Sequence, residues 1–397
     1  MGSSTTKLPK TEKNLKDLEC SIFNIGLGEM QGWRGNMEDA SLIHIAQNHT
    51  PPEEEELLDN TSIDSESASS SIVKELNLTD KSERTKLKQD IKSKSPECNI
   101  SIIGVFDGHG GSFISRFVAE NFMTVFNNAW VKSYLKGMNN GHKKPAKIIK
   151  DKIDYEDLNT ITIDKLEQLL IQTFLDMDEL LMLKTVDRLV HDYKHFKRDD
   201  LVLSDVSQLL SEEYDQEVIR ENFAYYMGTT GNVVCLYENY LIVANVGDSM
   251  SVLFTEGKAV ELNTEHKVST PGEEERVLKA GLHVINNRVD GKLNLTRAIG
   301  DLQFKNRKLR PYEQAVTAYP ELTTYELDES SEFVISACDG IWDCVEPQKL
   351  CEFVSKELKA GKKISEIIAR IEDMVLSNTN NSPIGTDNMT CIILQFK

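Results

Sequence analysis

The stretch that most constrains this chain is an apolar run, Ile100–Phe106, that stops abruptly at Asp107 and continues as Gly-His-Gly-Gly. A run rich in branched and apolar residues is typical of a buried strand. Ser112 then opens an apolar pattern with helical spacing, for which its side chain is a suitable N-terminal cap. Asp107 is therefore predicted at a strand end, where glycine backbone lets an ion or a phosphate come close. An acid beside glycine after a strand is more often only a turn, so this stretch alone leaves both interpretations open.

The same arrangement recurs elsewhere, which favours one shared site over independent turns. Asp248 and Asp339 each end an apolar strand beside a glycine, and Asp387 leads into the last strand. We expect these acids at one rim of a sheet, with Glu38 and Asp39 available from an earlier segment. Carboxylate oxygens suit hard cations such as Mg²⁺ and Mn²⁺. Without cations, so many neighbouring carboxylates would repel one another strongly.

Arg34 and His109 point to phosphate chemistry at this rim. Two metal ions that share a carboxylate can polarise a phosphoryl group and generate hydroxide near neutral pH. Arg34 adds a planar fork that grips phosphate oxygens, and His109 could protonate a leaving alkoxide. The competing interpretations are a surface ion pair for Arg34 and a turn residue bonded to a carboxylate for His109.

Strand-like runs joined by short turns, with helical segments grouped in pairs, predict an α+β fold with antiparallel sheets. Glycines are expected to break residues 20–45 into short strands. The other expected strands are 100–106, 233–237, 240–246, 252–254, 259–262, 333–338 and 390–396, and the expected helices are 112–130, 166–181, 271–280, 347–358 and 364–376.

Residues 20–397 are expected to form one domain, after a flexible N-terminal segment, 1–19. Residues 47–97 are acidic and Ser-rich with no sustained apolar period, which predicts an inserted disordered loop. Residues 184–221 are charged with scattered leucines, and one interpretation is a helical insertion.

The chain of 397 residues has a formal net charge of −19, which argues against nucleic acid as a partner. Its seven cysteines, irregularly spaced and without a signal peptide, indicate reduced thiols in the cytoplasm. No apolar stretch approaches the length of a membrane span. We expect a cytoplasmic monomer.

The first seven residues fit the N-myristoylation pattern, with Gly2 as the acceptor. Lysines at positions 7, 10, 13 and 16 would add an electrostatic signal, so weak peripheral association with membranes is one expectation. The alternative is a polar terminus that matches by chance, or a cloning remnant.

Taken together, these motifs resemble the metal-dependent serine/threonine protein phosphatases of type 2C. The resemblance runs from about residue 20 to the C terminus, outside the two insertions. The matching motifs, in family order, lie at 32–34, 37–40, 105–111, 228–230, 246–249, 295–301, 337–343 and 385–390. The resemblance implies two antiparallel sheets packed face to face and flanked by helix pairs, a four-layer α/β/β/α sandwich with the metals at one edge.

The resemblance also implies residue roles. Asp107 would be shared by two Mg²⁺ or Mn²⁺ ions, one of them also held by Asp339 and Asp387. The other ion would take the Gly108 carbonyl with Glu38 and Asp39, and a weaker third would take Asp248 and Asp343 with Asp339. Arg34 would bind the phosphate of phosphoserine or phosphothreonine in protein substrates, and His109 would be the general acid. A metal-activated water would attack directly, without a phosphoenzyme.

The chain departs from the family pattern at Met250, at Gly231 and in the segment 265–268, but no predicted ligand is missing. Two alternatives remain: an inactive member that only binds phosphoproteins, and a hydrolase of another phosphoester. An inactive member would be expected to have lost ligands. A nucleotide or nucleic-acid hydrolase would be expected to show a base-binding aromatic or a basic groove.

Overall fold

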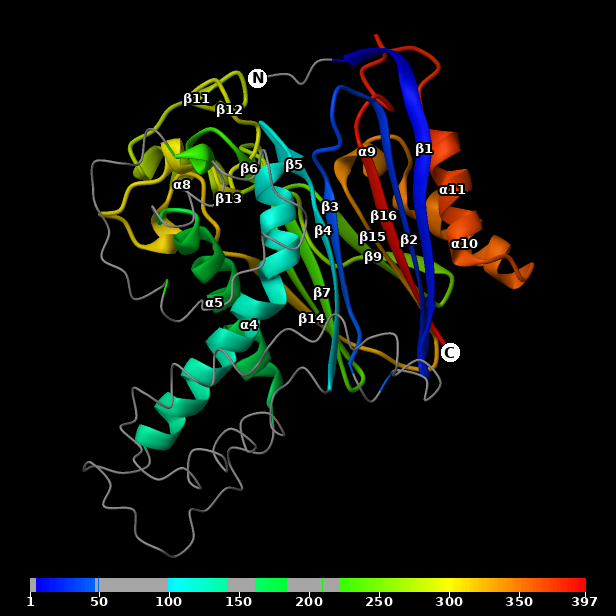
Figure 1. The fold of residues 1–397 in the computed structure, drawn as a ribbon, viewed down its shortest axis with the longest axis horizontal. Coiled ribbons are helices and arrows are strands. Elements are labelled where there is room, and N and C mark those ends of the chain that lie inside the picture. The colour runs from blue at the N-terminus through cyan, green and yellow to red at the C-terminus, as the bar shows by residue number, and fades with distance from the viewer. Residues whose placement is uncertain (1–4, 47–48, 50–98, 141–160, 184–208, 210–221) are drawn as a thin grey trace, which may run out of the picture.

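The computed structural model describes residues 5–46, 49, 99–140, 161–183, 209 and 222–397. Two antiparallel β-sheets pack face to face, and a pair of helices covers the outer face of each (Figure 1). This arrangement confirms the predicted four-layer α+β fold. Apart from positions 49 and 209, the two expected insertions lie outside the described residues.

The first sheet has six strands, whose neighbours all pair antiparallel. In spatial order they are β1 (Thr5–Glu19), β2 (Phe23–Arg34), β16 (Met389–Phe396), β15 (Ser331–Ala337), β9 (Met250–Thr255) and β10 (Lys258–Glu261).

The second sheet has five strands and is also antiparallel throughout. In spatial order they are β14 (Glu321–Glu326), β8 (Tyr240–Val246), β7 (Gly231–Tyr237), β4 (Ile100–Phe106) and β3 (Ala40–His44). Two smaller sheets consist of β13 (Ile299–Gly300), β6 (Gly228–Thr229) and β5 (Gly108–His109), and of β11 (Val284–Ile285) and β12 (Arg288–Val289).

Helices α4 (Phe113–Asn140) and α5 (Ile163–Leu180) cover the second sheet, and α10 (Pro347–Lys359) and α11 (Ile364–Val375) cover the first. The short helices α8 (Glu273–Lys279) and α9 (Asp339–Trp342) follow β10 and β15, and 3₁₀ turns lie at Phe223–Tyr225, Leu302–Phe304 and Pro311–Glu313. Of the helices described, none combines the length and apolar character that a membrane crossing requires.

The strands are apolar at successive positions because both faces of each sheet are covered. In β4, Ile102 packs into the core beneath α4 and α5, whereas Ile103 packs between the two sheets. In β16, Ile392 lies between the sheets and Ile393 lies beneath α10 and α11. Successive side chains along a strand point to opposite faces of the sheet. When both faces are buried, both sets of side chains are apolar, and the usual alternation of apolar and polar residues disappears.

The expectation that glycines break residues 20–45 into short strands is wrong, because β2 runs unbroken through Gly26 and Gly28. A Cβ atom at Gly26 would lie 2.3 Å from Ile364 Cγ2, and one at Gly28 would lie 2.3 Å from Ile368 Cγ2. Both isoleucines belong to α11. These glycines therefore allow α11 to approach the sheet closely, which is a second reason for glycine inside a strand.

The N-terminal segment, which was predicted to be flexible, forms the edge strand β1 from residue 5 onward (Figure 1). Its partners are backbone groups of β2 and side chains of α11. Lys13 Nζ lies 2.5 Å from Asp373 Oδ1, and Asp17 accepts a hydrogen bond from the Ser365 N–H at 2.9 Å. The polar sequence of residues 5–19 did not indicate that this segment would pair with β2 and α11.

The first predicted helix is longer than expected, since α4 continues through Gly137 to Asn140. A glycine inside a helix costs only about 1 kcal/mol relative to alanine, so it does not end a helix by itself. The other predicted helices and the hairpin of β7 and β8 agree with the structure to within a few residues.

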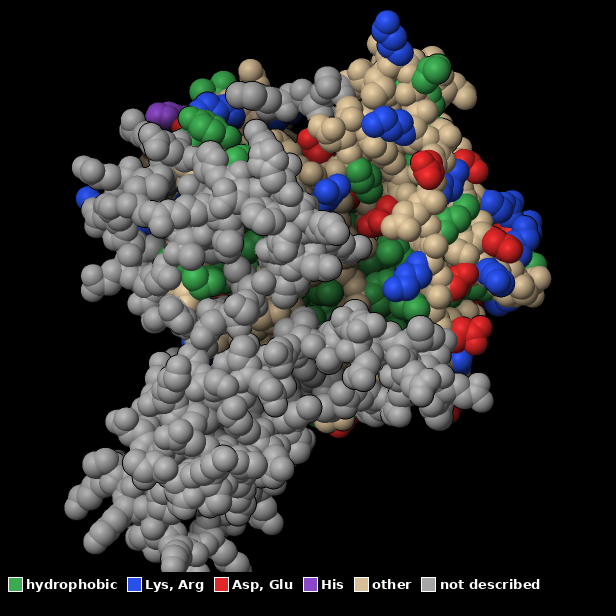
Figure 2. All heavy atoms as spheres, in the orientation of Figure 1, with side chains coloured by type: hydrophobic (Ala, Val, Ile, Leu, Met, Phe, Trp, Pro, Cys, Tyr) green, Lys and Arg blue, Asp and Glu red, His purple; other side chains and the backbone are tan. Residues whose placement is uncertain are grey.

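Basic and acidic side chains are intermixed on the side of the molecule formed by α10 and α11 (Figure 2). Several are paired, such as Lys362 with Glu357 at 2.7 Å and Lys349 with Glu346 at 2.9 Å. The negative charge of the chain is therefore not gathered on this part of the surface.

Candidate active site

The predicted carboxylates meet at one end of the two sheets. Asp107 follows β4, Asp248 follows β8, Asp339 begins α9 after β15, and Asp387 precedes β16. Burial raises the pKa of Asp107 well above its ordinary value, and the carboxylates of Asp39, Asp339, Asp387 and Asp248 raise it further. Strand ends that are distant in sequence thus deliver a cluster of acids to one partly buried place.

The backbone of Asp107 is hydrogen-bonded to Thr229, the last residue of β6, and to Thr230, which follows it. Its N–H donates to Thr230 Oγ1 at 3.0 Å, and its carbonyl accepts from the Thr229 hydroxyl at 3.0 Å and from the Thr230 N–H at 2.9 Å. These bonds fix where the strand ends and hence where the carboxyl group is presented.

Asp339 lies at the start of α9, and burial raises its pKa well above the ordinary value. Asp248, Asp387 and Asp343 raise that pKa further. Its buried Oδ1 atom accepts no hydrogen bond of normal geometry from the described residues. A buried carboxylate oxygen without a partner is costly, and this atom is therefore suited to a cation.

Glu38 and Asp39, between β2 and β3, lie against this cluster. Asp39 accepts a hydrogen bond from the Thr390 hydroxyl at 2.8 Å, and burial, with a smaller contribution from Asp387, raises its pKa to about 7. Burial also raises the pKa of Glu38, an effect that Arg34 partly offsets.

Gly108, whose carbonyl is a predicted ligand, lies in β5 next to the Glu38 backbone. A Cβ atom at Gly108 would lie 2.2 Å from the Glu38 carbonyl oxygen, and the Ser115 hydroxyl donates to that same oxygen. Two residues predicted to share an ion are thus in backbone contact.

Arg34, at the end of β2, donates from Nη2 to Asp387 Oδ2. The two side chains keep 30% and 32% of their surface exposed. Arg34, the predicted phosphate-binding residue, therefore lies at the cluster. Its guanidinium group, however, already donates to Asp387, which was predicted as a metal ligand.

His109 is paired with Asp301, which was not among the predicted site residues. His109 Nε2 lies 2.5 Å from Asp301 Oδ2, and Asp301 is almost wholly buried. Burial lowers the pKa of His109, but the neighbouring Asp301 carboxylate outweighs it, so the pKa is raised above the ordinary value. The signal was present, since Asp301 also follows a glycine at the end of a short strand, β13.

Asp248 and Asp343, the predicted third-ion ligands, lie beside a lysine. Lys267 Nζ lies 3.4 Å from Asp248 Oδ2 and 2.9 Å from Glu265 Oε2. Burial raises the pKa of both aspartates, and Lys267 lowers it in part. An ammonium group thus supplies positive charge at this edge of the cluster, and Lys267 was not among the predicted site residues.

Within the residues that the structure describes, no three acidic, histidine or cysteine side chains are arranged as ligands of a single ion. The carboxylates instead bond to Arg34, Thr390 and Lys267. The donor set nevertheless fits a hard cation, because it consists of carboxylates and a backbone carbonyl and includes the unpartnered Oδ1 atom of Asp339. The assignment of individual ligands stays a prediction.

Comparison with known proteins agrees with this geometry. A family model described as protein phosphatase 2C matches residues 181–382. A rice protein, "Probable protein phosphatase 2C 58", is 30% identical over 398 residues, covering 98% of this chain and 88% of the relative. "Protein phosphatase 2C homolog 2" of Aspergillus flavus is 31% identical, covering 99% of this chain and 68% of the relative.

Solved structures share the fold. The crystal structure of serine-threonine phosphatase 2C from Toxoplasma gondii superposes with a TM-score of 0.57 at 15% identity, covering 97% of this chain and 99% of that one. The motifs, the family model and these relatives agree, and the chain belongs to the protein phosphatase 2C family.

Proposed function

We propose that this protein hydrolyses phosphoserine and phosphothreonine esters in proteins, in a reaction that depends on Mg²⁺ or Mn²⁺. The observation that carries the proposal is the meeting of carboxylates from distant strand ends, some buried and some partly exposed, which raise one another's pKa. Such a cluster must either hold protons or neutralise its charge with cations. Divalent ions at this place would polarise a phosphoryl group and activate water near neutral pH.

Two ions, with a weaker third, would account for the acids present. Asp107 would be shared by the first two, with Asp339 and Asp387 on one side. The remaining ligands would be the Gly108 carbonyl, Glu38 and Asp39 for the second ion, and Asp248 and Asp343, with Asp339, for the third.

Arg34 would orient the substrate by donating to phosphate oxygens, since its side chain is partly exposed beside the cluster. The pair with Asp387 would then have to be shared or broken when substrate binds.

His109 would act as the general acid. With Nε2–H directed to Asp301, the second N–H of the imidazolium, at Nδ1, is the proton available to the leaving alkoxide. When water attacks phosphorus and the phosphorus–oxygen bond to the serine breaks, that proton would neutralise the departing oxygen. Asp301 would keep the imidazole charged and oriented.

The test is hydrolysis of a phosphoserine peptide by the full chain in Mn²⁺ and in EDTA. We expect turnover only with the metal, and a loss of at least about a hundredfold in Asp107→Asn, Asp339→Asn or Asp387→Asn. Asp328→Asn, an acid in the turn before β15, is the matched control and should behave as wild type. Wild-type rates in any of the three variants would remove that residue from the site, and full activity in EDTA would overturn the proposal.

Acylation of Gly2 and weak association with membranes also stay proposals, supported only by the N-terminal pattern and its lysines. Lys13 is already bonded to Asp373, which leaves it less available to a membrane surface. The mass of the protein purified from its native source decides whether Gly2 carries an acyl chain.

A further inference from the structure

The turn that carries Asp301 has an uncommon backbone conformation. Gly300 and Asp301 both have positive φ, at 87° and 52°. Glycine adopts such angles readily, whereas a residue with a side chain keeps them only where its surroundings hold it there. The Asp301 carboxylate lies 2.5 Å from His109 Nε2. The groups that hold this turn therefore also fix the carboxylate that orients the proposed general acid.

Two hydrogen bonds to distant parts of the chain hold the turn. The Asp301 N–H donates to the Met227 carbonyl at 2.8 Å, beside β6. The Gly300 N–H donates to a side chain instead, Oδ1 of Asp178 on α5, also at 2.8 Å. Asp178 and Gly300 are 122 residues apart in the sequence. Helix α5, which covers the second sheet, is thus joined directly to the turn at the site.

Lys305 completes this contact from the segment that follows the turn. Its Nζ atom lies 2.5 Å from the same Asp178 oxygen and donates to the Ala298 carbonyl at 3.0 Å. Burial raises the pKa of Asp178, whereas the Lys305 ammonium and the Gly300 N–H partly offset this and favour the carboxylate. Residues on both sides of the turn, Ala298 and Lys305, are therefore tied to one anchoring oxygen.

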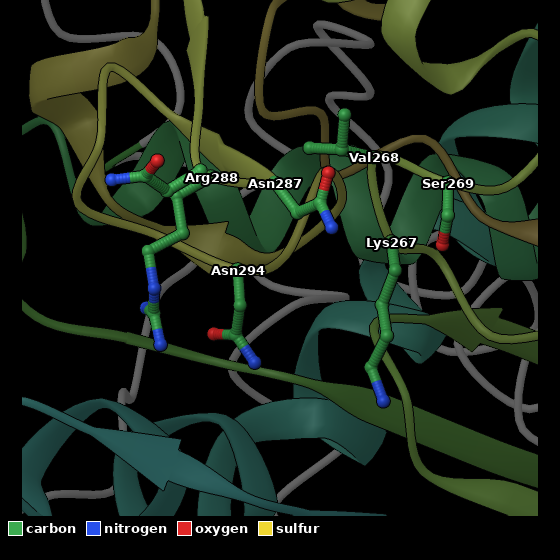
Figure 3. Close-up of a pocket in the computed structure, with 7 residues that line it drawn as sticks. Lys267, Val268, Ser269, Asn287, Arg288 and Asn294 are labelled. Carbon is green, nitrogen blue, oxygen red and sulfur yellow. The ribbon is translucent and has the colours of Figure 1, made fainter.

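The pair is too enclosed to bind substrate itself. The side chains of Lys305 and Asp178 are 4% and 11% exposed. Lys267, the lysine beside Asp248, is 29% exposed and lines a pocket (Figure 3). An ammonium group placed like that of Lys267 can meet a ligand, whereas Lys305 can influence the reaction only through the residues that it holds.

Apolar packing alone would not give α5 this control over the turn. Met177 and Leu180 of α5 share a hydrophobic core with Ile299 and Leu302. Such contacts attach the helix to the segment around the turn, but they have no direction and offer no acceptor to the Gly300 N–H. A buried ion pair commonly adds little stability compared with apolar residues of similar size. What the pair adds to the packing is a directional contact at the turn.

We propose that Asp178 and Lys305 are positioning residues for the general acid. They hold the turn at Gly300 where the Asp301 carboxylate meets His109, and they act on the substrate only through those last two residues. The inference rests on the proposed function and deepens it, because control of the general acid extends from the site to a helix of the outer layer.

The experiment compares two double variants in which both buried charges are removed, since one unpaired buried charge would destabilise the fold. Asp178→Leu/Lys305→Met leaves no acceptor for the Gly300 N–H. Asp178→Asn/Lys305→Met is the matched control, because Asn has the branched shape of Leu and keeps an oxygen at that position. For each protein, kcat is measured in Mn²⁺ on a phosphoserine peptide, whose alkoxide needs a proton, and on p-nitrophenyl phosphate, whose phenolate does not. The ratio of the two rates cancels any general loss of active enzyme.

We expect the ratio of peptide to p-nitrophenyl phosphate turnover to fall about five- to twentyfold in Asp178→Leu/Lys305→Met and to stay within about twofold of wild type in the control. Asp178→Glu keeps the charge pair but displaces the carboxylate by one methylene, so it should lower the ratio at least about threefold. This variant carries the test if circular dichroism shows that a double variant does not fold. In a His109→Ala background, adding Asp178→Leu/Lys305→Met should lower the ratio no further, because the residues act as one unit.

Equal ratios in the two double variants, a wild-type ratio in Asp178→Glu, or a further fall in the His109→Ala background would overturn the inference while leaving the phosphatase proposal intact. A ratio that His109→Ala does not lower would remove the general acid and the inference with it. If wild type hydrolyses neither substrate in Mn²⁺, the proposed function itself fails.

Discussion

Asp301 is the residue that decides how His109 can act. It is buried, its carboxylate lies 2.5 Å from His109 Nε2, and it raises the pKa of His109, which favours the charged imidazole that the proposed general acid requires. This places it in the role of a positioning residue, since it would act on the substrate only through His109.

Asp301→Asn should therefore slow the reaction in a way that depends on the leaving group. For a phosphoserine peptide, whose alkoxide needs a proton, we expect kcat to fall by roughly tenfold to a hundredfold, as in His109→Ala. For p-nitrophenyl phosphate, whose phenolate leaves unprotonated, the fall should be much smaller. Steady-state kinetics on both substrates measure this, and equal losses would assign Asp301 a purely structural role.

The acidic residues of the site could be predicted from single residues and their sequence neighbours, whereas the side chains that pair with them could not. Asp107, Asp248, Asp339 and Asp387 share a local pattern, an acid beside a strand end, that can be read from neighbouring residues. The pairing of Lys267 with Asp248 depends on how segments distant in sequence pack, which no local pattern records.

Among the elements, α11 carries a buried acid that the site does not use. Glu372 is 0% exposed, and neither of its carboxylate oxygens has a hydrogen-bond partner among the described residues. Burial raises its pKa to about 8, Lys13 of β1 partly opposes this, and Asp373 and Glu29 add to it.

This acid predicts a stability that falls as pH rises. Above its ordinary pKa of 4.5 the unfolded chain loses the proton, whereas the folded chain keeps it up to about pH 8. Glu372→Gln should thus stabilise the protein by up to roughly 4 kcal/mol at pH 8, shrinking towards zero below pH 4.5. Urea unfolding across this range measures the effect. Glu366→Gln, an exposed acid on the same helix, should show no such slope, and a flat difference for Glu372→Gln would contradict the assignment.

Strand β1 supplies the cap that α11 lacks. The residue before the helix, Lys363, makes no side-chain cap, and the Asp17 carboxylate accepts from the Ser365 N–H instead. An acid at a helix N-terminus also interacts favourably with the helix dipole.

Asp17→Ala should therefore lower the free energy of unfolding by about 1 kcal/mol, the usual cost of losing a cap. Denaturant titration at constant pH measures this, with Glu12→Ala on the exposed side of the same strand as the control. If both variants lose the same stability, β1 does not cap the helix.

The strands and helices were predicted well where apolar runs are long, as in β4, β8 and β15. The predictions were wrong where an element depends on contacts with a neighbouring element rather than on its own sequence. Glycine has a low strand propensity, but Gly28 lies inside β2 because its missing side chain makes room for Ile368 of α11. The sequence of β1 is polar, yet this segment forms the edge strand of the first sheet.

At the scale of the whole molecule, two sheets covered on both faces leave one shared rim for chemistry. Strand ends from both sheets bring their acids there, and burial between the layers is what raises their pKa values. A cluster of this kind costs stability when it is empty of positive charge, so cations should bind it and stabilise the fold together.

The most direct test of this account is a calorimetric titration of the metal-free full chain with Mn²⁺, alongside its thermal unfolding. We expect about two ions per chain, together with a higher melting temperature at saturating Mn²⁺, and we expect both effects to be reduced in Asp107→Asn. Binding and stabilisation that are absent in the wild type, or unchanged in Asp107→Asn, would contradict it.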